Sequence, residues 1–210
     1  MLIRTAAIGV TTLLASAVIA VPSTATAAAA PGTTSLAAVL AADGNRFDRN
    51  HHDFDIVDRA VRTVLKAKPN SPVGLLAQGN KRATAFIPTD RAFMRLVRSL
   101  TGNTPRSEKR TFRAVASVAD VDTLETILLY HVVPGMTITS AQAAKADGAA
   151  LTTAQGGKVR VNVRPGGRIF LRDNDRNARN PEVRPGLVDI NKGNKQIAHG
   201  INRVLRPIDL

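Results

Sequence analysis

The chain has 210 residues, of which 44% are hydrophobic and only 3% aromatic, and it carries a formal net charge of +13 with no cysteine and no tryptophan. This length allows one ordinary domain or at most two small ones. The lack of cysteine excludes a disulfide framework, a thiolate nucleophile and a sulfur-ligated zinc site, so the packing of a largely aliphatic core must hold the domain together.

The N-terminus has the pattern of a secretory signal peptide over residues 1–27. A basic start at Arg4 precedes an apolar run over residues 5–21, and residues 22–27 supply a helix breaker and an A-x-A cleavage site. Hydroxyl side chains interrupt the apolar run, whereas a membrane-spanning helix needs about 20 predominantly apolar residues. We therefore expect a secreted protein, cleaved after Ala27 or Ala29, without a membrane span.

Helical patterns dominate the chain from residue 35 to residue 130, after a leader over residues 28–34 that we expect to be disordered. Apolar residues at steps of three and four form one face of a helix over residues 56–65. A short β-rich run over residues 83–88 interrupts the helices. Two more helical patterns cover residues 107–118 and 121–130, and Thr139 and Ser140 begin a small alanine-rich helix. The side chains expected to cap helices are those of Ser35, Ser71, Thr89 and Asp120.

The last third of the chain has the pattern of β-strands. Residues 158–164 alternate strictly between valine and polar side chains, which predicts a half-buried strand. Further strands are expected over residues 168–172 and 187–191, followed by a final strand pair that ends at Pro207. Helices followed by an antiparallel sheet predict an α+β fold rather than a doubly wound sheet.

Three separated segments resemble the signatures of the fasciclin (FAS1) domain family. Residues 84–93 (TAFIPTDRAF) are similar to the first signature, residues 128–135 (LLYHVVPG) to the Tyr-His segment, and residues 196–207 (QIAHGINRVLRP) to the closing signature. The resemblance implies a fasciclin domain over residues 35–210, with helices packed on a small antiparallel β-sandwich or wedge, of the secreted bacterial single-domain type.

Most residues of these segments are interpreted as architecture. Thr89 and Asp90 are expected to cap a helix whose Phe93 faces inward. The family usually has an aspartate where this chain has Asn202, and an amide accepts charged hydrogen bonds less strongly than a carboxylate, so a family role that rests on that acid is in question here. The residues assigned structural roles are Thr84, Phe86, Pro88, Thr89, Asp90, Phe93, Pro134, Gly135, His199, Asn202, Val204, Leu205 and Pro207.

Tyr130 and His131 are the candidate partner-binding residues. The resemblance implies this role, because the Tyr-His segment of the family is implicated in integrin-mediated adhesion. The alternative is that both side chains are buried and hydrogen-bonded where a helix meets a strand. A bacterial-style signal peptide argues against an animal integrin as the natural partner.

No catalytic residue, cofactor or metal site is expected. The chain has no G-x-S-x-G elbow for a hydrolase, and the closing histidine, His199, is expected to be structural. His51, His52, Asp53 and Asp55 could hold a surface metal, but helix capping by the aspartates explains the same pattern. We therefore expect a protein that is not an enzyme.

Two binding functions are consistent with the sequence. One is a protein–protein adhesion module at the cell surface or in the extracellular matrix, which as a single domain would need homo-oligomers to bridge two surfaces. The other is binding of polyanions, such as cell-wall polymers or acidic polysaccharides, by scattered lysine and arginine side chains. Nucleic acid is not expected as a partner, because few aromatic residues are available to stack on bases.

Overall fold

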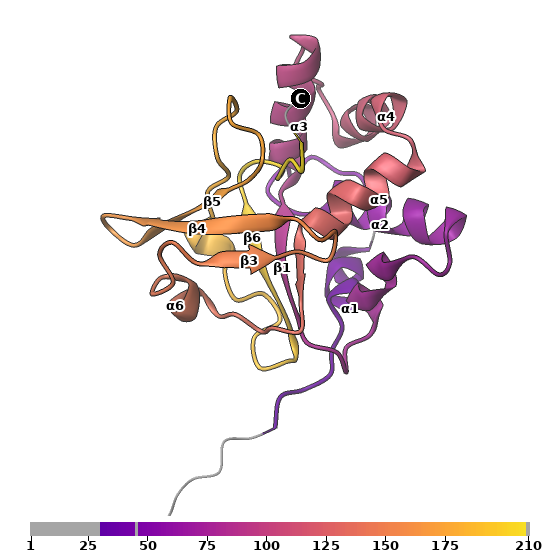
Figure 1. The fold of residues 1–210 in the computed structure, drawn as a ribbon. Coiled ribbons are helices and arrows are strands. Elements are labelled where there is room, and N and C mark those ends of the chain that lie inside the picture. Colours follow the sequence, from indigo (N-terminus) through magenta and orange to yellow (C-terminus); the bar gives the residue numbers. More distant parts are fainter. Residues whose placement is uncertain (1–29, 45, 209–210) are drawn as a thin grey trace, which may run out of the picture. The chain divides into compact units, whose positions relative to one another are not determined.

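Helices precede most of the strands in the computed structural model, which describes residues 30–44 and 46–208 (Figure 1). The predicted signal peptide and its cleavage site lie outside the described residues. None of the helices in the described part of the chain is long and apolar enough to cross a bilayer.

Local capping signals determine where most of the helices begin. Ser35 accepts a hydrogen bond from the backbone of Ala38, Ser107 from Arg110 and Asp120 from Thr123. The α-helices are α1 (Leu36–Leu40), α2 (Asp55–Ala67), α3 (Asp90–Thr101), α4 (Glu108–Val118), α5 (Val121–Tyr130) and α6 (Ser140–Ala143), and short 3₁₀ helices span Ala41–Asp43, Pro72–Ala77 and Pro185–Leu187. The predicted cap Ser71 also bonds to its helix, whereas the side chain of Thr89 makes no capping hydrogen bond. Thr139 caps α6.

The strands form two three-stranded sheets. The strands are β1 (Ala83–Pro88), β2 (Val132–Pro134), β3 (Ala150–Thr152), β4 (Lys158–Arg164), β5 (Arg168–Arg172) and β6 (Gln196–Ile201). One sheet has the order β2-β1-β6 and the other the order β3-β4-β5. Strand β1 pairs with β2 in antiparallel and with β6 in parallel, in a register that places Phe86 beside His199.

The first sheet is buried on both faces, because it lies between the helices and the second sheet. Alternate side chains of β1, such as Ala85 and Ile87, join a core with Ile56 of α2 and Leu124 of α5. On the opposite face, Phe86 joins a second core with buried side chains of β4 and β5. Figure 1 shows this order, with α1, α2 and α5 beside β1 and the orange strands β3, β4 and β5 on its other side.

The α+β fold class is confirmed, and four local expectations are corrected. The expected final strand pair ending at Pro207 is a single strand, β6, which ends at Ile201. The β1–β6 pair is parallel, so the first sheet is mixed and not wholly antiparallel. Residues 187–191 do not form a strand, because only Ile190 bridges to β6 there. Part of the expected disordered leader is ordered: Gly32 exchanges backbone hydrogen bonds with Gly193 and Lys195.

Candidate functional site: a basic surface track

Tyr130 ends α5 with its ring completely buried. Its exposed fraction is 0%, and its hydroxyl donates a hydrogen bond of 2.9 Å to the carbonyl of Lys158 on β4. Burial raises the pKa of Tyr130 to about 12, so the hydroxyl keeps its proton. The tyrosine thus joins the last turn of α5 to the second sheet.

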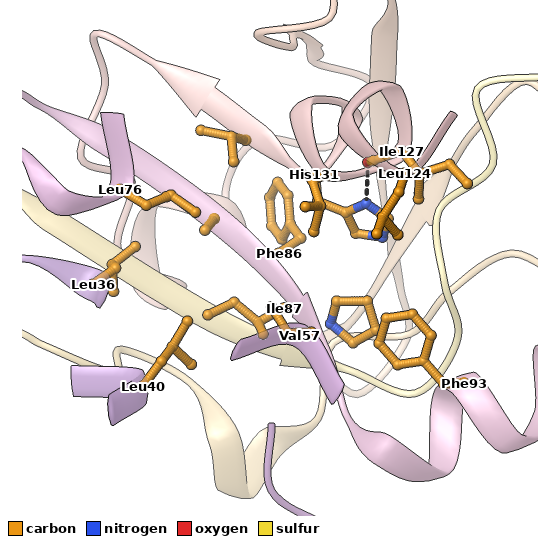
Figure 2. Close-up of a pocket in the computed structure, with 14 residues that line it drawn as sticks. Leu36, Leu40, Val57, Leu76, Phe86, Ile87, Phe93, Leu124, Ile127 and His131 are labelled. Carbon is orange, nitrogen blue, oxygen red and sulfur yellow. Dashed lines mark hydrogen bonds between the residues drawn. The ribbon is translucent and has the colours of Figure 1, made fainter. Parts of the chain in front are cut away.

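His131 is buried beside it and uses both ring nitrogens. Nδ1 donates to the carbonyl of Ile127 at 2.7 Å, and Nε2 therefore accepts from the backbone N–H of Leu205 at 2.9 Å. Burial lowers the pKa of His131 to about 4, which keeps the ring neutral. Figure 2 shows the bond to Ile127 and places the ring with Phe86 at a cavity of about 30 Å³.

The geometry of Tyr130 and His131 supports the architectural alternative. Neither side chain is presented to solvent, and each polar atom already has a partner inside the domain. A partner could reach these side chains only if the junction of α5 and β2 opened. A binding function of the folded domain would therefore use a surface other than Tyr130 and His131.

The first signature connects elements through polar groups as well as through packing. Thr84 donates to the carbonyl of Met136 and accepts from the N–H of Ile138, which fixes the loop after β2. Asp90 accepts from the N–H of Ile56, so it caps α2 and not its own helix, α3. Phe86 and Phe93 are both buried, as is Pro88. Pro134 is the exposed last residue of β2, and Gly135 follows it in a turn with a φ of 77° that favours glycine.

His199, Asp189 and Ser140 are the residue types of a hydrolase triad, but their hydrogen bonds are not those of a triad. Its Nε2 is 2.8 Å from the carbonyl of Ile138, and its Nδ1 accepts from the N–H of Asp189. The hydroxyl of Ser140 donates to the carboxylate of Asp189 and not to the histidine. This arrangement fixes a loop but cannot activate Ser140, because the general base of a triad must bond to the nucleophile.

Asn202, where the resemblance implies an acid, fixes a loop through two hydrogen bonds. Its amide oxygen accepts from the N–H of Glu182 at 2.9 Å, and its amide nitrogen donates to the Glu182 carboxylate at 3.3 Å. Val204 and Leu205 after it are buried, and Pro207 is half-buried. The closing segment thus connects the end of β6 to the loop that carries Glu182.

A basic hollow lies where α3 faces the loop before α4. It has a volume of about 390 Å³ and is lined by Arg91, Arg95 and Arg98 of α3, Arg106 of the loop, and His51. The arginines at 91, 95 and 98 stand three or four residues apart, which places them on one side of the helix. The hollow is therefore an opening with guanidinium groups on two sides.

Two further basic hollows adjoin the first through shared lining residues. Arg95 also lines a small hollow of about 20 Å³, and Asp173 connects this one to a third hollow of about 460 Å³ beside β4 and β5. Asp173 is the sole carboxylate among the described residues that line the three hollows. We call the joined surface the basic track; its cations are Arg91, Arg95, Arg98, Arg106, Lys158, Arg160, Arg172, Arg176, Arg179, Arg203 and Arg206.

The cations of the basic track raise one another's electrostatic energy. Burial lowers the pKa of Arg95, and so do the neighbouring charges of Arg203, Arg91 and Arg184. Burial and two further arginines likewise lower the pKa of Arg203. Among the described residues, Arg206 is the member of the track with a carboxylate partner, Asp175 at 2.8 Å. A bound anion would thus relieve repulsion between groups that the protein itself leaves largely unpaired.

The sequence did not reveal this clustering. The basic residues are scattered along the chain, and the arginines of α3 are about 100 positions from Arg203 and Arg206. The parallel pairing of β1 with β6 brings the two segments together, because α3 follows β1 and residues 203–206 follow β6. The i, i+3 and i+4 spacing of arginines along α3 is the one local signal that could have identified part of the track.

Comparison with known proteins finds a family model and a solved structure that are similar to this chain. Residues 60–207 match the Fasciclin domain. The chain belongs to the fasciclin domain family. Its fold is similar to the solved structure of a FAS1 domain pair from the insect cell adhesion molecule fasciclin I, with a TM-score of 0.56 and 17% sequence identity.

The similarity to the insect structure extends over 83% of this chain and 51% of that one, so this chain spans about half the length of the domain pair. A comparison with curated proteins finds no match. The fasciclin fold of this chain therefore rests on the family match and on the similarity of the two structures.

Proposed function

We propose that this fasciclin domain is a non-enzymatic binding module that acts outside the cell and attaches there to anionic polymers, such as acidic polysaccharides or cell-wall polymers. The basic track is the observation that carries the proposal, because it joins eleven cationic side chains with a single lining carboxylate. Family membership supports a role in adhesion or binding. The signal-peptide pattern of residues 1–27 supports secretion.

A linear polymer suits this surface better than a small ligand. The two larger hollows, of about 390 and 460 Å³, lie on different elements and are connected by a third. Exposed arginines bind carboxylate and sulfate groups through paired N–H donors. Several such contacts along one polymer would add up, whereas each alone is weakened by solvent and salt.

The basic track also offers a route to adhesion that does not need Tyr130 or His131. A protein that binds a surface polymer is held at that surface by noncovalent contacts. The alternative, direct adhesion to a protein partner, would use a less salt-dependent apolar patch. The two functions therefore differ in their response to ionic strength.

The test is binding of the mature chain (residues 28–210) to alginate and heparin, with neutral dextran as a control, from about 50 to 200 mM salt. The test variant carries Arg91→Gln, Arg98→Gln and Arg106→Gln. The matched control carries Lys66→Gln, Arg113→Gln and Lys145→Gln, which remove the same charge from exposed residues outside the basic track.

We expect steeply salt-dependent binding to the acidic polymers. Near an anionic surface a basic residue contributes about 1 kcal/mol, so the test variant should bind roughly 100-fold more weakly and the control much less so. Equal losses in the two variants would show that net charge and not the basic track drives binding. Salt-tolerant binding to a protein partner, without binding to the polymers, would favour the adhesion alternative.

A further inference from the structure

Three helices begin around one group of carboxylates. Asp53 lies two residues before α2, Asp90 is the first residue of α3, and Glu108 is the first residue of α4. One carboxylate oxygen from each of the three lies within 4.8 Å of the other two. The chain segments that carry them are far apart in sequence, so the fold itself assembles the group.

Asp90 and Glu108 in this group are completely buried, each with 0% exposure. Both oxygens of Glu108 have partners: Oε2 accepts from the N–H of Asp48, and Oε1 pairs with Nδ1 of His51 at 2.8 Å. Oδ1 of Asp90 accepts from the N–H of Ile56 at 2.9 Å. Each of these three oxygens thus has a hydrogen-bond partner.

Two oxygens of the group remain without a donor. Oδ2 of Asp90 and Oδ1 of Asp53 are buried and accept no hydrogen bond from any described residue. Ion pairs do not supply the missing charge either, because His51 with Glu108 is the only ion pair that the described residues form with this group. A buried carboxylate oxygen without a partner is costly, so these two oxygens require either a bound cation or a proton that they share.

We infer that Asp53, Asp90 and Glu108 form a binding site for a hard divalent cation, with Ca²⁺ the best fit. Carboxylate oxygens are the donors that such ions prefer, and Ca²⁺ holds them at about 2.3–2.6 Å, so oxygens on opposite sides of the ion lie about 4.6–5.2 Å apart. Ligands of Mg²⁺ at about 2.1 Å would have to lie closer together. The three oxygens lie within 4.8 Å of one another, a separation that a Ca²⁺ ion between them can bridge.

Two further carboxylates lie next to the site, one exposed and one buried. Asp53 also forms a group with Asp48 and Asp55, again with oxygens within 4.8 Å of one another. Calcium takes 6–8 oxygen ligands, and this second group offers more of them, from the loop at Asp48 and from the first residue of α2, Asp55. His51 contributes by holding Glu108 in place through Oε1, as outer-sphere partners of metal ligands commonly do.

A cation at this place would join α2, α3 and α4 at their N-termini. It would also fix the loop that carries His51, which lines one hollow of the basic track together with Arg91. The competing arrangement is a proton shared by Asp53 and Asp90. Burial and the hydrogen bond with the Asp53 carboxyl raise the pKa of Asp90 to about 9, in the direction that this shared proton requires.

The experiment uses the mature chain (residues 28–210) after treatment with EDTA and dialysis. Calorimetric titrations with CaCl₂, MgCl₂ and ZnCl₂ at constant ionic strength measure binding directly, and thermal unfolding measures the same ions through stability. The test variants are Asp90→Asn and Asp53→Asn. The control is Asp122→Asn, which removes a carboxylate of α5 that is 80% exposed and belongs to neither carboxylate group.

We expect one Ca²⁺ per chain, a saturable rise in the melting temperature, and weaker binding of Mg²⁺. Asp53→Asn should weaken Ca²⁺ binding at least about tenfold, and Asp122→Asn should leave it unchanged. Asp90→Asn should do the same as Asp53→Asn; if it does not fold, Asp53→Asn in the half-exposed loop decides the question. Absence of Ca²⁺ binding, or binding that both test variants retain, would overturn the inference in favour of the shared proton.

Discussion

The side-chain amide of Asn202 binds both the backbone and the carboxylate of Glu182. It accepts from the N–H at 2.9 Å and donates to the carboxylate at 3.3 Å. An aspartate at this position could make only the first of these bonds, because a carboxylate has no donor. Asparagine at position 202 and glutamate at position 182 are thus matched to each other.

The first prediction follows from this match. Asn202→Asp should lower the free energy of unfolding by about 1 kcal/mol at pH 7, because it replaces a hydrogen bond by two like charges. Adding Glu182→Gln should recover part of the loss, because a glutamine can donate to the new carboxylate. The measurement is urea unfolding of the two single variants and the double variant, followed by circular dichroism since the chain has no tryptophan. Strictly additive effects would contradict a direct coupling of the two side chains.

The second prediction concerns the buried hydroxyl of Tyr130. Tyr130→Phe removes its hydrogen bond to the carbonyl of Lys158 and should cost about 1 kcal/mol of stability. Binding to alginate should not change, because the ring is completely buried and lies in the core. A variant of full stability with reduced binding would restore Tyr130 as a partner-binding residue.

The third prediction is a loss of stability in acid that His131 causes. Its pKa is about 4 in the folded protein, against 6.5 in the unfolded chain. As the pH falls below 6.5, His131 becomes protonated in the unfolded state, whereas in the folded state it stays neutral until about pH 4. Stability is therefore lost between pH 6.5 and pH 4, by roughly 3 kcal/mol from this residue.

Comparison with His131→Gln isolates this contribution from other titrating groups. The variant should be less stable than the original chain at pH 7, and the difference should shrink by roughly 3 kcal/mol by pH 4. Urea unfolding at several pH values measures it. His52→Gln is the control, because His52 is exposed. A difference between the His131 variant and the original chain that stays constant with pH would show that the histidine is not buried in its neutral form.

Sequence reasoning was most successful where the signal is local. Neighbouring residues in the chain determine the cap at Asp120 and the alternation of residues 158–164. The elements α4, α5 and β4 have the predicted bounds within a residue or so. Strand β3 was not predicted, since its three residues show no period of their own and are fixed by pairing with β4. The predicted strand over residues 187–191 was wrong, because Asp189 and Asn191 adopt positive φ values of 54° and 67°.

Binding surfaces were harder to predict because distant segments create them. The motif residues of the Tyr-His segment were found, but only the structure shows that they are buried. The basic track and the carboxylate group each combine segments that the β1–β6 pairing and the packing of α2, α3 and α4 bring together. The positions of charged residues along the sequence do not indicate these contacts, because the contacts join distant segments.

The final prediction tests whether the segment before α1 is part of the domain. A Cβ atom on Gly79 would lie 1.7 Å from the backbone oxygen of Thr33 and 2.9 Å from the nitrogen of Ser35. Gly79→Ala should therefore displace this segment and cost about 1–3 kcal/mol of stability. The measurement is urea unfolding together with hydrogen exchange of residues 32–40, which should become faster.

Gly186→Ala is the matched control, because a Cβ atom there meets nothing within 4 Å and the backbone has no positive φ. Its effect on stability should be close to zero, and exchange of residues 32–40 should stay slow. If both variants behave alike, the contact between Gly79 and Thr33 does not hold the segment. If only Gly79→Ala accelerates exchange, the segment around Thr33 is a structural part of the fasciclin domain, although the family match begins at residue 60.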